Sequence, residues 1–253
     1  MCKTSGTQAA GRGPWELVPV LALSAVFLAA ICGCPRATQN CDCPDIGYNP
    51  VINPNNFVDV VNNPYLPLTP GTSYVYLAET DEGTERIEVS VTDDTIEILG
   101  VTCTVVRDTG SLDGNLVEDT FDWFAQDTDG NVWYFGEASM EYNDGVVVGT
   151  FGSWKAGVDC AEPGIVMPAS PQVGNTYRQE FYQCVAEDEA KVLALGELVT
   201  VPYGIFNNCV RTEEFSRLEP DAVEQKVYAP GIGHILTIAD GERTDELVSI
   251  TTN

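Results

Sequence analysis

The chain has 253 residues, with 12 Lys and Arg against 38 Asp and Glu, one His and nine Cys, and a formal net charge of −26. Binding to nucleic acid or to an anionic membrane surface depends on clustered basic side chains, so this charge excludes both as main partners. The hydrophobic fraction of 44% is too high for a disordered chain and supports a sizeable core. A single histidine argues against His-based metal sites and a His-dependent catalytic triad.

The first 33 residues are predicted to be a signal peptide. Lys3 and Arg12 precede an apolar run over residues 17–31. A spanning helix needs roughly 20 apolar residues, so this shorter run is more typical of a signal-peptide core. Plain secretion and an uncleaved membrane anchor remain alternatives.

The apolar run ends in the sequence Ile31-Cys32-Gly33-Cys34, which resembles the bacterial lipobox. The resemblance implies cleavage before Cys34 and attachment of a diacylglycerol to its thiol. Lipidation at Cys32 would place bulky Ile31 at the cleavage site, which is less suitable. We therefore expect a protein exported and anchored to the bacterial cell envelope, on its periplasmic or cell-surface side, through the Cys34 lipid.

Residues 34–70 are rich in Pro and Asn. Proline removes backbone donors and breaks helices and central strands, so this segment is predicted to be an extended, lipidated tether. The β domain is predicted to cover residues 71–253.

Short alternating runs begin near Tyr74 and are separated by Asp-Gly pairs such as Asp113-Gly114, Asp144-Gly145 and Asp240-Gly241. Such pairs favour hairpin turns, and alternation with period two indicates antiparallel strands with one wet face. We expect an all-β, antiparallel meander.

An internal repeat is the most informative feature of the chain. It predicts two tandem homologous units, about 71–155 and 171–250, packed as a sandwich or joined as a curved half-barrel. Its matched landmarks follow the same order at nearly constant spacing: Gly71 to Tyr74 with Gly174 to Tyr177, Cys103 with Cys209, Arg107 with Arg211, Phe124-Ala125 with Tyr228-Ala229, and Gly130 with Gly233.

Cysteines past Cys34 are even in number, which suggests disulfides in an exported protein. Equivalent residues approach each other near a pseudo-two-fold axis, so we expect Cys103–Cys209, which leaves Cys160–Cys184. Cys41 and Cys43 are too close in sequence for an unstrained bond, and their state is left open.

The loop Asp127-Thr128-Asp129-Gly130-Asn131 is a weak calcium candidate, because Asp127, Asp129 and Asn131 supply alternating oxygen ligands. No acidic residue follows at loop position 12, where Ala138 stands. A β-turn capped by Asp and Asn side chains is the favoured interpretation. No other cofactor is predicted.

No catalytic constellation emerges from the sequence. His234 lies at a turn entering an apolar strand and is expected to be structural. Aromatic residues concentrate in the strands, where we expect most to fill the core, or alternatively to line a greasy pocket between the sheets. The aromatic set is Phe121, Trp123, Phe124, Trp133, Tyr134, Phe135, Trp154, Tyr177, Phe181 and Tyr182.

Four segments together resemble a family of uncharacterised bacterial secreted proteins and lipoproteins. The resemblance covers most of residues 63–250 and implies an all-β envelope protein with no assigned reaction. Its motifs are Asn63 to Leu68 with Pro70-Gly71, Gln126 to Glu137, Gly164 to Pro168, and Tyr228 to Gly233.

The leading expectation is a non-catalytic, lipid-anchored envelope protein that binds an apolar ligand or a protein partner. An acidic surface scaffold or adhesion module, with or without a dependence on calcium, is the alternative and would show no cavity. A carboxylate-based hydrolase is less favoured, because it needs two converging carboxylates, one with a raised pKa.

Overall fold

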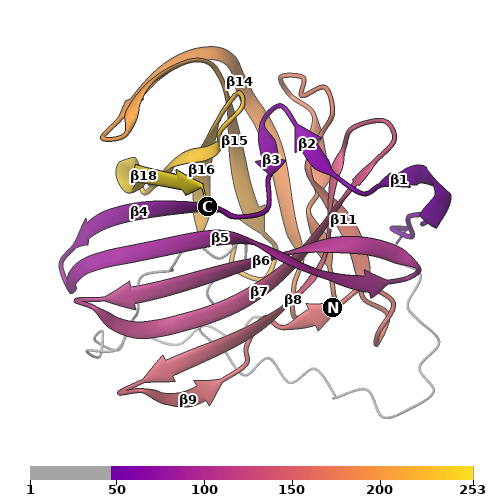
Figure 1. The fold of residues 1–253 in the computed structure, drawn as a ribbon, viewed down its shortest axis with the longest axis horizontal. Coiled ribbons are helices and arrows are strands. Elements are labelled where there is room, and N and C mark those ends of the chain that lie inside the picture. The colour runs from indigo at the N-terminus through magenta and orange to yellow at the C-terminus, as the bar shows by residue number, and fades with distance from the viewer. Residues whose placement is uncertain (1–46, 253) are drawn as a thin grey trace.

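Figure 1 shows a computed structural model of the chain, which describes residues 47–252. These residues are almost entirely β and antiparallel, which confirms the predicted fold class. Within this range no helix is long and apolar enough to cross a membrane. The predicted signal peptide, Cys34, Cys41 and Cys43 lie outside the described residues.

Two runs of long strands build the sheet, each as a meander of consecutive antiparallel hairpins. Strands β18 and β4 pair with each other, so the two runs join side by side in one curved sheet. The first run is β4 (Thr72–Thr80), β5 (Gly83–Ile98), β6 (Val101–Leu112), β7 (Asn115–Asp127) and β8 (Val132–Asn143). The second run is β14 (Asp188–Val201), β15 (Gly204–Ser216), β16 (Val223–Ala229), β17 (Gly233–Ala239) and β18 (Glu242–Thr252).

The hairpin turns follow the predicted Asp-Gly chemistry. At 113–114, 144–145 and 240–241 both residues have positive φ, for example 49° at Asp113 and 81° at Gly114. Two central residues in this region of φ make the hairpin turn whose twist matches that of the flanking strands. The turns therefore fix the register of the long strands.

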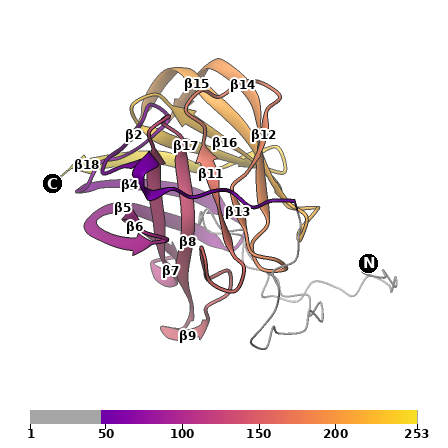
Figure 2. The same cartoon turned by 90° about the vertical axis from the view of Figure 1, so that its right-hand side faces the viewer.

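The two edges of the sheet meet in a single short segment, which nearly closes a barrel (Figure 2). Strand β12 (Thr176–Arg178) pairs with β14 at one edge, and β13 (Glu180–Phe181) pairs with β11 (Glu162–Met167) at the other. Only Gln179 separates β12 from β13. Gly164 of β11 approaches the Gln179 backbone so closely that a Cβ at position 164 would overlap it. Short strands β1 (Phe57–Val58), β9 (Val146–Gly149) and β10 (Trp154–Lys155) pair onto β7 or β8.

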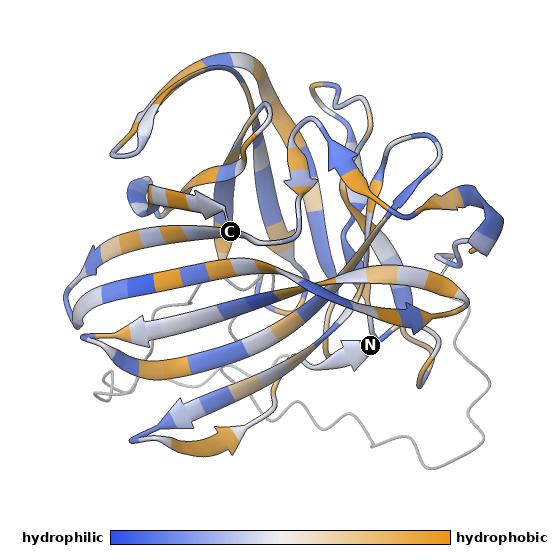
Figure 3. Cartoon of the chain, in the orientation of Figure 1, coloured by the Kyte–Doolittle hydropathy of each residue, from blue (hydrophilic) through white to orange (hydrophobic). Residues whose placement is uncertain are grey.

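Alternation along the strands separates the interior of the barrel from its outer face (Figure 3). In β4, Tyr74, Tyr76 and Ala78 are buried, whereas the residues between them are partly exposed. Successive side chains of a strand point to opposite faces, so every second residue of each strand faces the interior.

The described part of the predicted tether packs against the barrel, which corrects the extended conformation expected for residues 34–70. A 3-10 helix, η1 (Pro54–Asn56), leads to a two-stranded sheet of β2 (Val61–Asn63) and β3 (Leu66–Leu68). Val61 and Leu68 are buried in the core. Proline breaks long central strands, yet it is tolerated in a two-stranded sheet where few backbone donors are needed.

The landmarks of the predicted repeat lie at equivalent places when β12, β14 and β15 are aligned with β4, β5 and β6. Gly71 N–H donates to Val91 O, and Gly174 N–H donates to Val192 O, each at 2.9 Å. Cys103 and Cys209 lie in β6 and β15. The repeat stays a prediction, and these matching positions support it.

The predicted disulfides are not formed. Cys103 and Cys209 are buried thiols, separated in the sheet by strands β16, β17, β18, β4 and β5. Their pairing was expected from face-to-face packing of the two units, whereas the two runs lie side by side in one sheet. Each thiol instead donates to a nearby carbonyl, Cys103 to Val101 O and Cys209 to Phe206 O. Cys160 is disulfide-bonded, but Cys184 is not its partner.

Candidate ligand-binding site

A cavity of about 70 Å³ lies inside the barrel, below the two-stranded sheet formed by β2 and β3. Its walls come from both runs of strands, so the junction between β18 and β4 creates it. Most of its lining is apolar or aromatic, with four ionisable side chains besides the tyrosines. The lining residues are Leu66, Pro67, Leu68, Tyr74, Tyr76, Val89, Val106, Asp108, Asp122, Phe124, Lys226, Tyr228, Ile232, Gly233 and His234.

The sheet of β2 and β3 forms a cap over the cavity and is fastened by hydrogen bonds to three separate loops. Asn63 Nδ2 donates to Gly130 O at 2.8 Å and to Pro168 O at 3.2 Å. Gly231 N–H donates to Pro64 O at 2.7 Å. The cap therefore has a fixed position relative to the strands beneath it.

Four segments that are far apart in the sequence meet at this cap. The segments beginning at residues 63, 126, 164 and 228 supply the groups that bond to one another there, and Asn62 and Gln126 exchange two further hydrogen bonds of 2.8 Å. Individually the segments had suggested only turn chemistry. Their convergence makes the cap and the cavity the main candidate site of the described chain.

The polar side of the cavity is acidic. Asp108 of β6 is 5% exposed and Asp122 of β7 is 2% exposed. Burial, reinforced by the Asp122 carboxylate, raises the pKa of Asp108 well above its ordinary value. Burial likewise raises the pKa of Asp122 to about 7, although a hydrogen bond from Tyr134 opposes the shift.

Asp122 and Glu137 share a proton through Tyr134. The Tyr134 hydroxyl lies 2.6 Å from Asp122 Oδ1 and 2.6 Å from Glu137 Oε2. A hydroxyl has one hydrogen, so only one of these bonds can be donated by tyrosine. The other requires a protonated carboxyl group. At least one of the two acids is therefore neutral in the folded protein.

A buried ion pair balances part of this acidity. Lys226 Nζ lies 2.8 Å from Glu214 Oε2, and their side chains are 6% and 10% exposed. Burial alone would lower the pKa of Lys226, but the nearby Glu214 and Glu224 carboxylates outweigh it and raise that pKa. Glu214 also accepts from the Tyr228 hydroxyl at 3.0 Å. Lys226 is therefore charged, and its ammonium group is already paired with Glu214.

His234 lies in the cavity wall. Its ring lies 5.2 Å from the Tyr76 ring, between centroids, and Nε2 is 3.1 Å from Thr237 Oγ1. Burial, followed by the charge of Lys226, lowers the pKa of His234 to about 3. The imidazole is thus neutral, and no described residue bonds to Nδ1.

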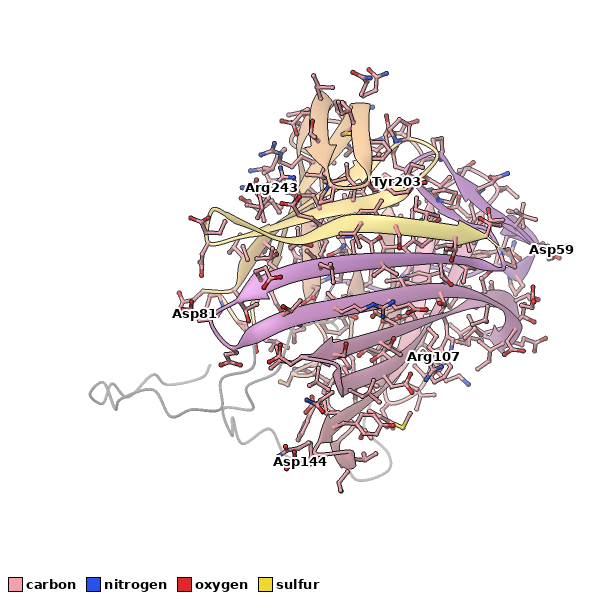
Figure 4. All side chains as sticks on the ribbon, turned by 60° about the vertical axis from the view of Figure 1, so that its left-hand side comes forward. Asp59, Asp81, Arg107, Asp144, Tyr203 and Arg243 are labelled. Carbon is pink, nitrogen blue, oxygen red and sulfur yellow. The ribbon has the colours of Figure 1, made fainter. Side chains whose placement is uncertain are left out.

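Sequence reasoning missed the interior acids because it assigned charged residues to a solvated face. The position of each acid along its strand indicates which face of the sheet it lies on. Glu85 shares a face of β5 with buried Ile87, and Asp122 shares a face of β7 with buried Phe124. Arg107 lies on the opposite face of β6 from Asp108, with a side chain 47% exposed, at the outside of the barrel (Figure 4).

The calcium candidate is a hydrogen-bonded turn. Asp127 Oδ1 accepts from the backbone of Asp129 and Asn131, and Oδ2 accepts from Asn131 Nδ2 and Trp133 Nε1. Asn131 Oδ1 accepts from Ala169 N–H. These contacts match the favoured β-turn interpretation. Calcium binding remains a prediction, and it would have to compete with these bonds.

Most of the aromatic residues fill the core, as expected. Phe124, Tyr134, Phe135, Trp154 and Phe181 are all buried. Trp133 and Trp123 pack partly buried against the core. Of the aromatic set singled out in the sequence, Phe124 also lines the cavity, where it is joined by Tyr74, Tyr76 and Tyr228.

No model of a protein family and no curated protein matches the chain. Among solved structures, the chain is similar to the crystal structure of a "putative lipoprotein" from Parabacteroides distasonis. The identity is 11% and the TM-score 0.33, and the match covers 74% of this chain and 98% of that one. At this level the similarity carries no argument about the fold or function of this chain.

Proposed function

We propose that the chain is a lipid-anchored envelope protein that binds a small, largely apolar ligand inside its barrel. The supporting observation is the capped cavity, whose aliphatic and aromatic walls surround a few polar groups. Such a lining is typical of small-molecule sites. The scaffold alternative predicts no cavity and is therefore less favoured.

The cavity also favours binding over hydrolysis. A carboxylate-based hydrolase needs one protonated acid and one ionised carboxylate facing the substrate. Asp108 and Asp122 both line the cavity, but burial raises the pKa of both. Burial therefore favours the neutral form of both acids and holds neither as the ionised carboxylate that this mechanism requires.

A cavity-filling substitution tests ligand binding. Val89→Phe places an aromatic ring in the cavity, whereas Val75→Phe places the same ring on the outer face of the neighbouring strand. With the full chain in one detergent throughout, we expect n-butanol to raise Tm in a concentration-dependent way in wild type and Val75→Phe. We expect Val89→Phe to weaken that binding at least about tenfold, because the ring occupies the ligand volume.

Equal butanol binding by Val89→Phe and Val75→Phe would place the ligand elsewhere. Absence of any shift in wild type up to the solubility limit of the alcohol would contradict the proposed site. The unliganded Tm of each variant, measured in the same series, separates lost binding from lost folding.

The lipid anchor is tested by cell fractionation. The Cys34→Ala chain, produced in a bacterial host, is expected to leave the detergent-extracted membrane fraction or to retain an uncleaved signal peptide, since the acylated thiol is gone. Cys32→Ala is the matched control and should stay lipidated. Loss of lipidation in the Cys32 variant alone would overturn the assignment of Cys34.

A further inference from the structure

We propose that the ligand of the cavity is a small primary ammonium compound with an apolar tail. This inference rests on the proposed function and names its ligand class. It is carried by two buried polar atoms, Asp108 Oδ1 and His234 Nδ1, which belong to residues that line the cavity and which bond to no described residue.

Unbonded polar atoms are rare inside folded proteins, because burial without a partner costs free energy. Asp108 is 5% exposed, and its Oδ1 has no hydrogen-bond partner within residues 47–252. Lys226 also lines the cavity, but its ammonium group is engaged by Glu214. Asp108 is therefore a carboxyl group without a matched donor.

One ring nitrogen of His234 has a partner among the described residues and the other has none. Nε2 lies 3.1 Å from Thr237 Oγ1, whereas Nδ1 is buried and bonds to no described residue. In the tautomer that donates from Nε2 to the threonine hydroxyl, Nδ1 keeps a lone pair that can accept from a ligand.

The surrounding charge selects a cation over a neutral donor. Asp122, Glu118 and Asp245 all act on Asp108 electrostatically in the same direction, against Lys226 alone. An ammonium group supplies three donors, and its positive charge lowers the pKa of Asp108 and so favours an ionised carboxylate beside it. The rings of Tyr76 and Tyr228 flank His234, with centroids 5.2 and 5.7 Å from its ring, and add faces that favour a cation.

The opposite wall suits a short alkyl chain. Leu66, Leu68, Phe124 and Ile232 lie around the cavity and offer no hydrogen-bonding side chains. A volume of about 70 Å³ holds roughly five water-sized groups. That estimate matches four carbons and one nitrogen, so n-butylamine is the appropriate probe.

The test compares n-butylamine, n-butanol and butyrate at pH 7, with dissociation constants taken from the rise of Tm with ligand concentration. We expect butylamine to bind about tenfold or more tightly than butanol, since bonds from a charged donor are stronger by over 1 kcal/mol. Butyrate should bind weakest, because it offers no donor and would bury a further carboxylate beside Asp108 and Asp122.

Asp108→Asn probes the head-group contact. Asparagine matches the shape of the neutral acid, so the variant is expected to fold, and its unliganded Tm checks this. It should lose most of the preference for butylamine while keeping butanol affinity within about twofold. Asp119→Asn is the control, because Asp119 lies on the outer face and pairs with Arg107.

Each outcome separates this inference from the proposed function. Equal affinities for butylamine and butanol, both lost in Val89→Phe, would overturn the ammonium inference and leave the apolar site standing. Preference for butyrate would overturn the inference in favour of a Lys226-directed anion. If none of the three probes binds, both proposals fail.

Discussion

Raising the pH from 5 to 8 is expected to lower the free energy of unfolding by at least about 3 kcal/mol. Burial raises the pKa of Glu85 to about 8 and that of Asp122 to about 7, while Asp188 and Asp245 reach about 6. Most proteins with ion-paired acids show the opposite trend between pH 2 and 5.

The sign follows from proton binding. In the unfolded chain these carboxyl groups titrate near pH 4, so between about pH 4 and pH 8 the folded state holds more protons. The stabilisation that the neutral acids contribute is fully present below about pH 4. It is lost as the pH rises through the pKa values that these acids have in the folded state. Ionisation above this window leaves buried carboxylates that repel one another.

Urea unfolding at both pH values measures the effect. Glu85→Gln and Asp122→Asn should each reduce the loss of stability, because one titrating group is removed. Glu88→Gln, on the outer face of the same strand as Glu85, should leave the pH dependence unchanged. Stability that is constant or rises between pH 5 and 8 would show that the interior acids are not neutral.

Lys226→Met is expected to destabilise the protein by about 3–5 kcal/mol, the cost of stranding a buried charge. The lysine forms the 2.8 Å ion pair with Glu214, and both side chains are almost fully buried. Its removal also takes positive charge away from Asp108, Asp188 and Asp245. Urea unfolding at a fixed pH of 7 gives the change in free energy.

Two further variants show whether the loss comes from the stranded partner. Adding Glu214→Gln to Lys226→Met should recover part of the lost stability, because the unpaired carboxylate is then absent. Arg86→Met breaks an exposed pair with Glu88, where the side chains are 46% and 38% exposed, and should cost less than about 1 kcal/mol. Equal losses for the Lys226 and Arg86 variants would contradict a buried, compensating role for Lys226.

Local features of the fold were predictable from the sequence because they depend on neighbouring residues. The Asp-Gly turns at 113–114 and 240–241 have positive φ at both positions, as their chemistry requires. Alternation in β4 and β5 separated the buried Tyr74 and Ile87 from partly or fully exposed neighbours. Turn type and strand alternation together define an antiparallel meander.

The way the two runs join was not predictable from the repeat. Two homologous units can pack face to face or extend one another, and the sequence alone favours neither. The pairing of β18 with β4 selects extension and keeps Cys103 and Cys209 in separate strands, so their predicted bond is not formed. The tertiary arrangement therefore determines that Cys103 and Cys209 stay thiols.

The cavity itself was predictable only in outline. The aromatic strands suggested a greasy pocket, but its polar residues are spread over distant segments. Asp108 and His234 are brought together only when β18 pairs with β4, and the cap comes from a proline-rich segment expected to be a tether. The alternation along β6 could have placed Asp108 on the inner face. No feature of the neighbouring sequence identified Leu68 as part of the cap.

The most direct measurement is a crystal structure of the full chain grown with saturating n-butylamine. The account predicts density for the alkyl chain between Leu68 and Phe124, with the nitrogen within hydrogen-bond distance of His234 Nδ1 or Asp108. A cavity that contains only water under these conditions, with the cap closed as in Figure 1, would contradict a ligand site inside the barrel.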